Sequence, residues 1–341
     1  MFSPRLFFPR VWYTAHHPLG YALAPFSRLF CLAVSVRRFA YRQALFKAHH
    51  PGVPVVVVGN ITTGGTGKTP LVVWLAHFLR RHGFRPAIVV RGYGGKAEYW
   101  PQWVNADTDP YLVGDEAVLL ARRADCRVMA SPDRVAATNV LPGQTNCNLI
   151  LCDDGLQHYA LARDVEIAVV DGDLGVGNGR CLPAGPLREP VSRLAEVDLV
   201  VRHTRGDEAI KPGVNPLGRT EYHMRLVPGA LRAVTDERIG SLEVLKKMPV
   251  HAVCGIGHPE RFFGMLRALG FTIRPHAFPD HHAFRAEELA FGDGLPILMT
   301  EKDAVKCHRF AKPNHWYLPV DAELDPALGV RLLQVLGERR H

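Results

Sequence analysis

The chain has 341 residues, 47% of them hydrophobic and 22% charged, a composition that favours two folded domains and excludes an intrinsically disordered chain. The seven cysteines are scattered singly without a C-x-x-C pair, which indicates reduced thiols in the cytoplasm. Thirteen basic residues, Arg5 among them, precede Glu98, the first acidic residue, although the net charge of the whole chain is only +8. A basic end on an acidic remainder indicates contact with an anionic surface, either nucleic acid or lipid head groups.

The N-terminal segment, residues 1–48, combines this charge with apolar and aromatic residues between Leu19 and Phe46. Pro25 and Arg28 interrupt it, so it fits neither a membrane-spanning helix nor a signal peptide. On a helix, one polar stripe would be formed by Arg28, Ser35, Arg38 and Arg42. The pattern predicts a basic, aromatic-rich helix that lies in a membrane interface. The alternative is a helix that packs on the core and exposes its arginines.

The next segment, residues 49–219, alternates apolar β-type runs with helical stretches. Strands are expected over Val53–Val58, Pro86–Val90, Arg127–Ala130, Leu149–Cys152, Ile167–Val170 and Leu199–Arg202. Helices are expected over Pro70–Arg81 and near Glu116–Ala124. Continuous apolar strands separated by helices predict an α/β fold with a mostly parallel sheet and helices on both faces.

A second, smaller α/β domain is expected over residues 220–341. Tyr222–Val227 and Leu231–Thr235, joined across Pro228-Gly229, predict an antiparallel hairpin or a linker. Strands are then expected over Val250–Cys254, Phe271–Phe278 and Pro296–Thr300, and helices over Pro259–Leu269, Arg285–Phe291 and Pro326–Gly337. The last of these helices could instead pack on the first domain.

A phosphate-binding loop follows the first strand, because Val55 to Thr69 reads as strand, glycine-rich loop and helix start. Lys68 would reach the β- and γ-phosphates of ATP, and Thr69 would place a hydroxyl on Mg²⁺. The general pattern G-x-x-x-x-G-K-T needs glycine where this chain has Thr62, so the loop must turn through Gly64 and Gly65. The fold is therefore P-loop-containing, and the expected ATP-binding residues are Thr62, Thr63, Gly64, Gly65, Thr66, Gly67, Lys68 and Thr69.

Acidic residues lie at two further positions where a carboxylate could bind a metal ion or accept a proton. Asp153 and Asp154 end an apolar strand, where a P-loop protein holds Mg²⁺, and the sequence leaves open which of them contacts the metal. Asp115 and Glu116 begin a helix after Gly114. They could satisfy the helix dipole or supply a general base for a phosphoryl acceptor, and the residues alone do not decide.

The remaining candidate functional residues lie in a turn and in a proline-rich loop. His281 and His282 follow Pro279, and because adjacent residues point in different directions, a two-histidine metal site is not expected there. Arg188 and Glu189 lie in a proline-rich loop that could clamp a phosphate or merely connect elements.

Together these motifs resemble the tetraacyldisaccharide 4'-kinases, the lipid A 4'-kinases of Gram-negative bacteria. The resemblance is carried in order by Gly59–Pro70, Arg91–Gly95, Val113–Glu116, Asp153–His158, Pro183–Pro190, Gly255–Pro259, Phe278–His282 and Thr300–Ala304. Thr62 belongs to this family's own version of the loop.

The resemblance implies an ATP-dependent kinase that phosphorylates the 4'-hydroxyl of tetraacyldisaccharide 1-phosphate at the cytoplasmic face of the inner membrane. It implies that Asp115, supported by His281, is the acceptor's base, and we expect this pair to be completed when the two domains close. Thr69 with Asp153 or Asp154 would hold Mg²⁺. The expected substrate contacts are Glu116, Arg134, Arg188 and Glu189.

The alternative is a P-loop ATPase switch that acts on a protein or nucleic-acid partner. A guanine-specific switch is disfavoured, because Thr300–Ala304 does not supply the Asn-Lys-x-Asp pattern that reads guanine. A nucleic-acid-dependent ATPase should carry its basic residues on the folded body, whereas here they concentrate in an apolar terminal segment. We therefore expect a membrane lipid as substrate and no nucleic-acid partner.

Overall fold

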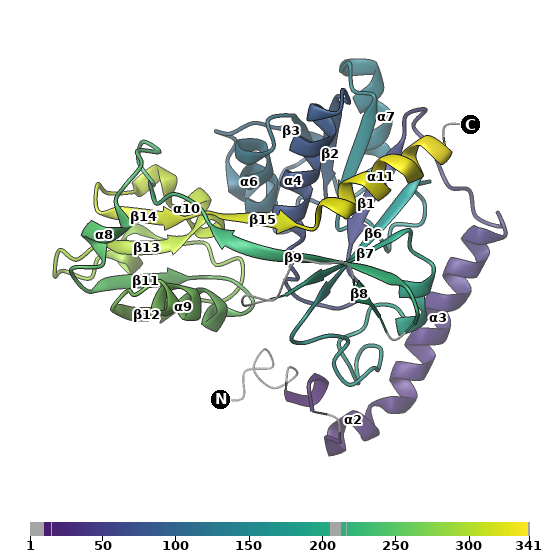
Figure 1. The fold of residues 1–341 in the computed structure, drawn as a ribbon, viewed down its shortest axis with the longest axis horizontal. Helices are drawn as coiled ribbons and strands as arrows, with labels where there is room; N and C mark the ends of the chain where they lie inside the picture. Colours follow the sequence, from purple (N-terminus) through teal and green to yellow (C-terminus); the bar gives the residue numbers. More distant parts are fainter. Residues whose placement is uncertain (1–9, 15, 205–212, 216, 340–341) are drawn as a thin grey trace. The chain divides into compact units, whose positions relative to one another are not determined.

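The computed structural model describes residues 10–14, 16–204, 213–215 and 217–339 (Figure 1). The chain forms two compact units. Unit 1 consists of Met1–Val89, Asp133–Leu226 and Ala322–His341, and unit 2 of Val90–Pro132 and Val227–Asp321. The chain therefore passes between the units four times, whereas the expected domains are consecutive blocks. Residues 1–9 and 15 of the predicted N-terminal segment, with Arg5, lie outside the described residues.

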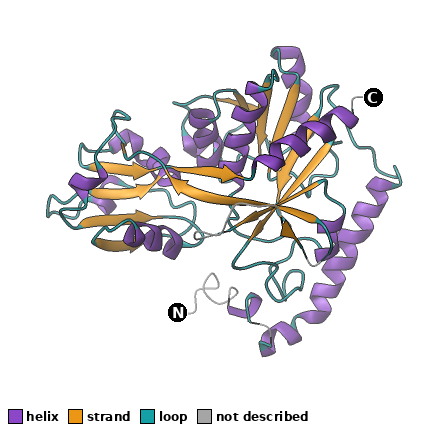
Figure 2. Cartoon of the chain, in the orientation of Figure 1, coloured by secondary structure: helices purple, strands orange, loops and turns teal. Residues whose placement is uncertain are grey.

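Unit 1 is built on a sheet of parallel strands in the order β9-β7-β6-β1-β5-β2. Figure 2 draws the strands in orange and the helices in purple. The strands are β1 (Val55–Gly59), β2 (Pro86–Val90), β5 (Leu149–Asp153), β6 (Val165–Asp171), β7 (Leu199–His203) and β9 (Thr220–Pro228), with β8 (Gly213–Val214) antiparallel to β9. Every residue of β1, β2 and β5 is buried, so both faces of the sheet are covered. The predicted mostly parallel α/β fold is confirmed.

The helices of unit 1 come from all three of its chain segments. They are α2 (Pro18–Ala22), α3 (Ala24–Arg42), α4 (Lys68–Arg81), α7 (Arg134–Gln144), the 3₁₀ turn η1 (Val191–Ala195) and α11 (Pro326–Glu338). In α4, Leu71, Leu75 and Leu79 recur every four residues and are fully buried. The last helix, α11, belongs to this unit, where Gly329 faces the ring of Phe78.

Unit 2 contains a five-stranded sheet in the order β10-β14-β13-β11-β12. Its second segment forms β10 (Arg232–Ala233), α8 (Leu242–Leu245), β11 (Val250–Cys254), α9 (Pro259–Ala268), β12 (Ile273–Ala277), η2 (Ala286–Leu289), β13 (Ile297–Thr300), α10 (Glu301–Cys307), η3 (His308–Phe310) and β14 (His315–Leu318). Its first segment forms the antiparallel pair β3 (Gln102–Val104) and β4 (Arg127–Ala130), with α5 (Pro110–Val113) and α6 (Asp115–Arg123) between them. β15 (Val320–Leu324) leads the chain back into unit 1.

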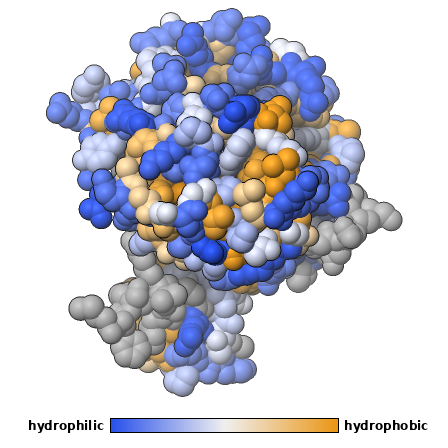
Figure 3. Space-filling model, turned by 90° about the vertical axis from the view of Figure 1, so that its left-hand side faces the viewer, coloured by the Kyte–Doolittle hydropathy of each residue, from blue (hydrophilic) through white to orange (hydrophobic). Residues whose placement is uncertain are grey.

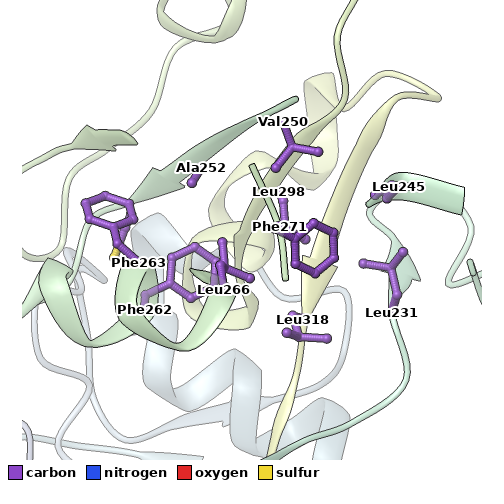
Figure 4. Close-up of a cluster of buried hydrophobic side chains, with 11 residues drawn as sticks. Leu231, Leu245, Val250, Ala252, Phe262, Phe263, Leu266, Phe271, Leu298 and Leu318 are labelled. Carbon is purple, nitrogen blue, oxygen red and sulfur yellow. The ribbon is translucent and has the colours of Figure 1, made fainter. Parts of the chain in front are cut away.

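A separate hydrophobic core supports the small sheet. Figure 4 shows Val250 and Ala252 of β11 and Leu298 of β13 with Phe262, Phe263 and Leu266 of α9. Figure 3 shows the face of the molecule that lies on the left in Figure 1, where hydrophobic residues lie in separate patches among hydrophilic ones. This core confirms the predicted second α/β body.

The hairpin alternative for residues 222–235 and one predicted helix are wrong, whereas the linker alternative agrees with the passage of the chain from unit 1 to unit 2 at Leu226 and Val227. Residues 222–227 and 231–235 do not form a hairpin, because β9 pairs in parallel with β7 while β10 pairs antiparallel with β14. The flanks of Pro228-Gly229 thus belong to two different sheets. The helix expected over 285–291 is only the 3₁₀ turn η2, which is held by the hydrogen bond from Arg285 N to Glu288 Oε2 at 2.9 Å.

A glycine pair on α11 offers a test of the packing in unit 1. A Cβ at Gly329 would lie 2.5 Å from the Phe78 ring, whereas a Cβ at Gly337 meets nothing within 4 Å. We expect Gly329→Ala to lower the free energy of unfolding by about 1–3 kcal/mol through overpacking. Gly337→Ala should leave it unchanged or raise it by up to about 1 kcal/mol. Urea denaturation measures both, and equal effects of the two changes would contradict this packing.

Candidate active site

The phosphate-binding loop between β1 and α4 is held by hydrogen bonds to itself and to a second loop. Asn60 Nδ2 donates to the carbonyl of Gly64 at 3.2 Å. The amide of Thr63 donates to Pro186 O at 2.8 Å, and the amide of Arg188 donates to Ile61 O at 2.7 Å. The proline-rich loop around Arg188 therefore fixes the first half of the phosphate-binding loop.

The turn of this loop lies at Gly64 and Gly67, where φ is +104° and +89°. Glycine adopts this left-handed conformation without a Cβ penalty. The sequence placed the turn at Gly64 and Gly65, so the first of the two positions is confirmed and the second is Gly67. The last glycine matters because it directly precedes Lys68, the first residue of α4.

The loop residues fit the phosphates of ATP. The 14-residue helix α4 has no acidic residue in its first turn, so its N–H groups and positive dipole end are available to an anion. The hydroxyl oxygens of Thr63 and Thr66 are buried without a hydrogen-bond partner in the part of the chain that the structure describes. Buried polar atoms of this kind are normally satisfied, and a bound phosphate would satisfy them.

Asp154 lies between two cations at the end of β5. Lys68 Nζ is 3.3 Å from its Oδ1, and Arg188 Nη1 is 3.1 Å from both carboxylate oxygens. Burial would raise the pKa of Asp154, but the charges of Lys68 and Arg188 outweigh it and lower the pKa to about 2. The φ of Asp154 is +50°, a conformation that non-glycine residues rarely adopt and that concentrates at functional sites. Asp154 is therefore an ionised carboxylate held in a strained, defined position.

The other predicted residues near the loop differ in exposure. Asp153 is buried, and Arg134, 3% exposed, donates through Nη2 to the carbonyls of Asp153 and Asp154 at 3.4 and 3.3 Å. Arg134 thus braces the end of β5. Thr69 is half-buried in the first turn of α4. Its hydroxyl and the two carboxylates are oxygen donors of the type that Mg²⁺ takes alongside phosphate oxygens. Among the described residues, no group of three His, Cys, Asp or Glu side chains could hold a metal ion.

Glu189 is fully buried. Its carboxylate accepts hydrogen bonds from Gln157 Nε2 at 2.7 Å and Tyr159 Oη at 2.5 Å, and it lies 3.2 Å from Arg193 Nε. Arg38 of α3 is 3.8 Å away. A substrate that reached Glu189 would have to displace one of these partners.

Asp115 and His281 meet in unit 2. Asp115 begins α6, is 4% exposed, and its Oδ1 and Oδ2 lie 3.1 and 3.2 Å from His281 Nδ1. The φ of His281 is +59°, and its ring centroid is 4.8 Å from that of Tyr93. Because both residues belong to unit 2 and are in contact, the expectation that the pair is completed by domain closure is wrong. The two residues form a preassembled pair.

The charges around the pair keep the carboxylate ionised. Burial would raise the pKa of Asp115, but the hydrogen bond with His281 and the charges of Lys302, His281 and Lys306 lower it. Burial would likewise lower the pKa of His281, but the hydrogen bond and the charge of Asp115 raise it. The pair therefore stabilises its own charged forms.

Sequence reasoning missed the lysines of α10. Lys302 Nζ lies 3.1 Å from Glu116 Oε1 and 3.3 Å from His281 Nε2, and Lys306 Nζ lies 3.7 Å from Asp115 Oδ2. Thr300–Ala304 contributed to the resemblance, but Lys302 received no role. One signal was available: a lysine in the first turn of a helix opposes the helix dipole and needs a local reason.

Comparison with known proteins places this geometry in a family. Residues 19–337 match the family described as tetraacyldisaccharide-1-P 4'-kinase. The chain is 53% identical to the tetraacyldisaccharide 4'-kinase of Nitrosococcus oceani, over 96% of this chain and 94% of that one. It is 50% identical to the enzyme of the same description from Alkalilimnicola ehrlichii, over 92% and 91%. The crystal structure of LpxK from Aquifex aeolicus in complex with ATP matches with a TM-score of 0.77 at 27% identity, over 93% of this chain and 99% of that chain.

Proposed function

The chain belongs to the tetraacyldisaccharide-1-P 4'-kinase family, and on this premise we propose that it transfers the γ-phosphate of ATP to the 4'-hydroxyl of tetraacyldisaccharide 1-phosphate in lipid A biosynthesis. The observation that carries the proposal is the hydrogen-bonded pair of Asp115 and His281. A sugar hydroxyl is a poor nucleophile, and the pair places a buried carboxylate with a hydrogen-bonded imidazole where a proton acceptor is needed. Family membership disfavours the alternative of a P-loop ATPase switch.

The transfer is a single displacement at the γ-phosphorus. The 4'-oxygen bonds to phosphorus while its proton passes to Asp115, and the bond to the bridging oxygen breaks so that ADP leaves with the electron pair. His281 orients the carboxylate through Nδ1. General-base catalysis of this kind contributes about 10²–10⁴-fold.

Residues of unit 1 bind and polarise the nucleotide. Lys68 offsets the charge that spreads over the γ-phosphate oxygens, and the loop from Thr62 to Gly67 surrounds the β-phosphate with N–H groups. Thr69 with Asp153 or Asp154 would hold Mg²⁺, which when bound offsets further phosphate charge. The strained, ionised Asp154 supports this assignment.

The candidate substrate contacts remain Glu116, Arg134, Arg188 and Glu189, and their exposures suggest different roles. Arg188 is 28% exposed. Its guanidinium could release the Asp154 carboxylate and bind a phosphate group in the same position. Glu116 is 43% exposed beside Asp115 and suits a sugar hydroxyl. Arg134 and Glu189, at 3% and 0%, would act chiefly by holding neighbouring groups.

The helix α3 supports docking to a membrane. Its large apolar side chains recur every three or four residues and are 57–66% exposed: Phe26, Leu29, Leu32, Val36 and Phe39. Another face bonds to the body of unit 1 through Ser27 Oγ to Cys181 O at 2.7 Å and Arg38 Nη2 to Glu196 Oε1 at 2.5 Å.

The exposed apolar stripe is the opposite of what a helix that buries its apolar face on the core would show. We therefore propose that the apolar stripe lies in the interface of the cytoplasmic leaflet of the inner membrane. The exposed Arg28 and Arg37 would then meet anionic head groups. Among the described residues, no helix has the length and apolar character needed to cross a membrane.

Lys68→Ala should abolish transfer while the protein stays folded. Loss of the transition-state charge interaction is expected to lower kcat/KM more than about a hundredfold, or about 3 kcal/mol. Lys246→Ala removes a lysine that pairs with the exposed Glu243 and serves as the control. Kinetics with labelled ATP and thermal melting measure activity and folding, and activity of Lys68→Ala within threefold of wild type removes the loop from the mechanism.

Asp115→Asn and His281→Ala should each lower kcat by about a hundredfold or more, the scale of general-base catalysis. Because the two residues act as one unit, the double variant should be little worse than either single one. The dissociation constant for ATP should stay unchanged in all three. Multiplication of the two losses in the double variant shows independent action and contradicts the pair.

Leu29→Ser/Val36→Ser should reduce sedimentation of the protein with anionic vesicles, because it removes apolar area from the α3 stripe. Ile239→Ser/Val244→Ser is the matched control, since those side chains are 67% and 54% exposed in unit 2. Salt should weaken but not eliminate wild-type binding, because screening acts only on the arginine contribution. If the α3 variant sediments like wild type, the docking surface lies elsewhere.

A further inference from the structure

The helix α3 has a second face, which contacts the body of unit 1 through polar groups. Ser27 and Ala40 are the buried residues of this 19-residue helix, so few of its side chains pack closely against the body. Arg38, whose side chain is 16% exposed, lies about three helical turns after Ser27 and therefore projects from the same side of α3. This side, which we call the inner face, is turned away from the exposed apolar stripe.

Ser27 contacts the loop that supports the phosphate-binding loop. Its Oγ donates a hydrogen bond to Cys181 O at 2.7 Å. Cys181 pairs with Leu187 in a β-bridge, and Leu187 pairs with Thr62 of the phosphate-binding loop in a second one. All four residues are buried. Two backbone bridges therefore connect the contact of Ser27 with the phosphate-binding loop, and loss of the Ser27 hydroxyl removes one donor from a buried carbonyl.

Arg38 reaches the same loop by a second path. Its Nη1 lies 3.8 Å from Glu189 Oε2, and because Glu189 is fully buried, solvent screens this attraction only weakly. Glu189 Oε1 accepts a hydrogen bond from Gln157 Nε2 at 2.7 Å. The same amide nitrogen donates to Asn60 O at 3.0 Å, and Asn60 Nδ2 donates to Gly64 O at 3.2 Å. Both paths thus end in the first half of the phosphate-binding loop.

We propose that Ser27 and Arg38 are positioning residues of the nucleotide site, which hold the phosphate-binding loop in the conformation that binds ATP. They act through Cys181 and Glu189 and do not touch the nucleotide. The helix α3 then has two functions on two faces, contact with a lipid surface through the apolar stripe and support of the ATP site through the inner face. The proposal rests on the proposed function, in which this loop binds the phosphates of ATP.

This role predicts a particular change in the kinetics. The turn at Gly64 has a φ of +104°, and a glycine gains conformational freedom when the contacts around it are lost. Loss of a support lowers the fraction of molecules whose loop is ready to bind, and the apparent dissociation constant rises by the inverse of that fraction. Saturating ATP restores the binding conformation, so KM for ATP should rise while kcat stays unchanged. A merely structural role predicts the opposite, because an inactive fraction lowers kcat at constant KM.

The test measures binding of the Mg²⁺ complex of β,γ-methylene-ATP to the full-length protein by calorimetry, together with KM for ATP and kcat. Ser27→Ala and Arg38→Met should each raise the dissociation constant and KM by about three- to tenfold, with kcat within about twofold of wild type. Arg38→Lys should recover affinity because it keeps the charge beside Glu189. Arg42→Met is the matched control, since Arg42 is 64% exposed and pairs with Glu196 at 3.1 Å, as Arg38 also does. Its affinity should equal that of wild type.

Three results would overturn the positioning role. They are wild-type affinity in both Ser27→Ala and Arg38→Met, a lowered kcat at unchanged KM, and an equal loss of affinity in Arg42→Met. If Arg38→Met fails to fold, Ser27→Ala decides alone, because it removes a single oxygen atom. Wild-type protein that does not bind the analogue would show that the proposed ATP-binding role of the loop is itself wrong. Wild-type protein that binds it, with both variants equally tight, would leave the proposed function intact and reject the positioning alone.

Discussion

The burial of one ionised carboxylate, that of Asp115, is the constraint on which unit 2 depends. An unpaired buried carboxylate costs several kcal/mol, so it must be surrounded by donors and cations. The unit supplies His281 at hydrogen-bond distance and two lysines of α10, Lys302 and Lys306, whose spacing of four places them on the same helix face. The dipole of α6, which Asp115 begins, acts in the same direction. The same contacts that keep this carboxylate ionised also reduce its basicity.

Unit 1 applies the same principle to Asp154, which Lys68 and Arg188 hold ionised at the end of β5. The two carboxylate sites also share a backbone feature, a residue with positive φ. Of the five non-glycine residues described with positive φ, two are Asp154 and His281. Such strain persists only where surrounding contacts impose it, and here those contacts are ion pairs and hydrogen bonds to functional groups. Each unit therefore holds one ionised carboxylate in a defined position, Asp154 in unit 1 and Asp115 in unit 2.

Local signals explain which features could be predicted from sequence. The strands β2, β4 and β11 have the expected bounds because continuous apolar runs end at turn residues, and the phosphate-binding loop follows from its glycines and Lys68. Features set by distant contacts could not be predicted from local patterns, and the pair of Asp115 and His281 was expected only through the family resemblance. Asp115 and His281 are 166 positions apart, and no local pattern shows that they share a unit. The false hairpin has the same origin, because its two strands pair with β7 and β14.

Transfer of phosphate from ATP to a lipid hydroxyl can be measured directly. The most direct measurement incubates the purified protein with Mg²⁺, γ-³²P-labelled ATP and tetraacyldisaccharide 1-phosphate in detergent, and locates the label by extraction and ³¹P NMR of the product. We expect label in the lipid fraction as a phosphate monoester at the 4'-position. Label released only as inorganic phosphate, at the same rate with and without lipid, would contradict it.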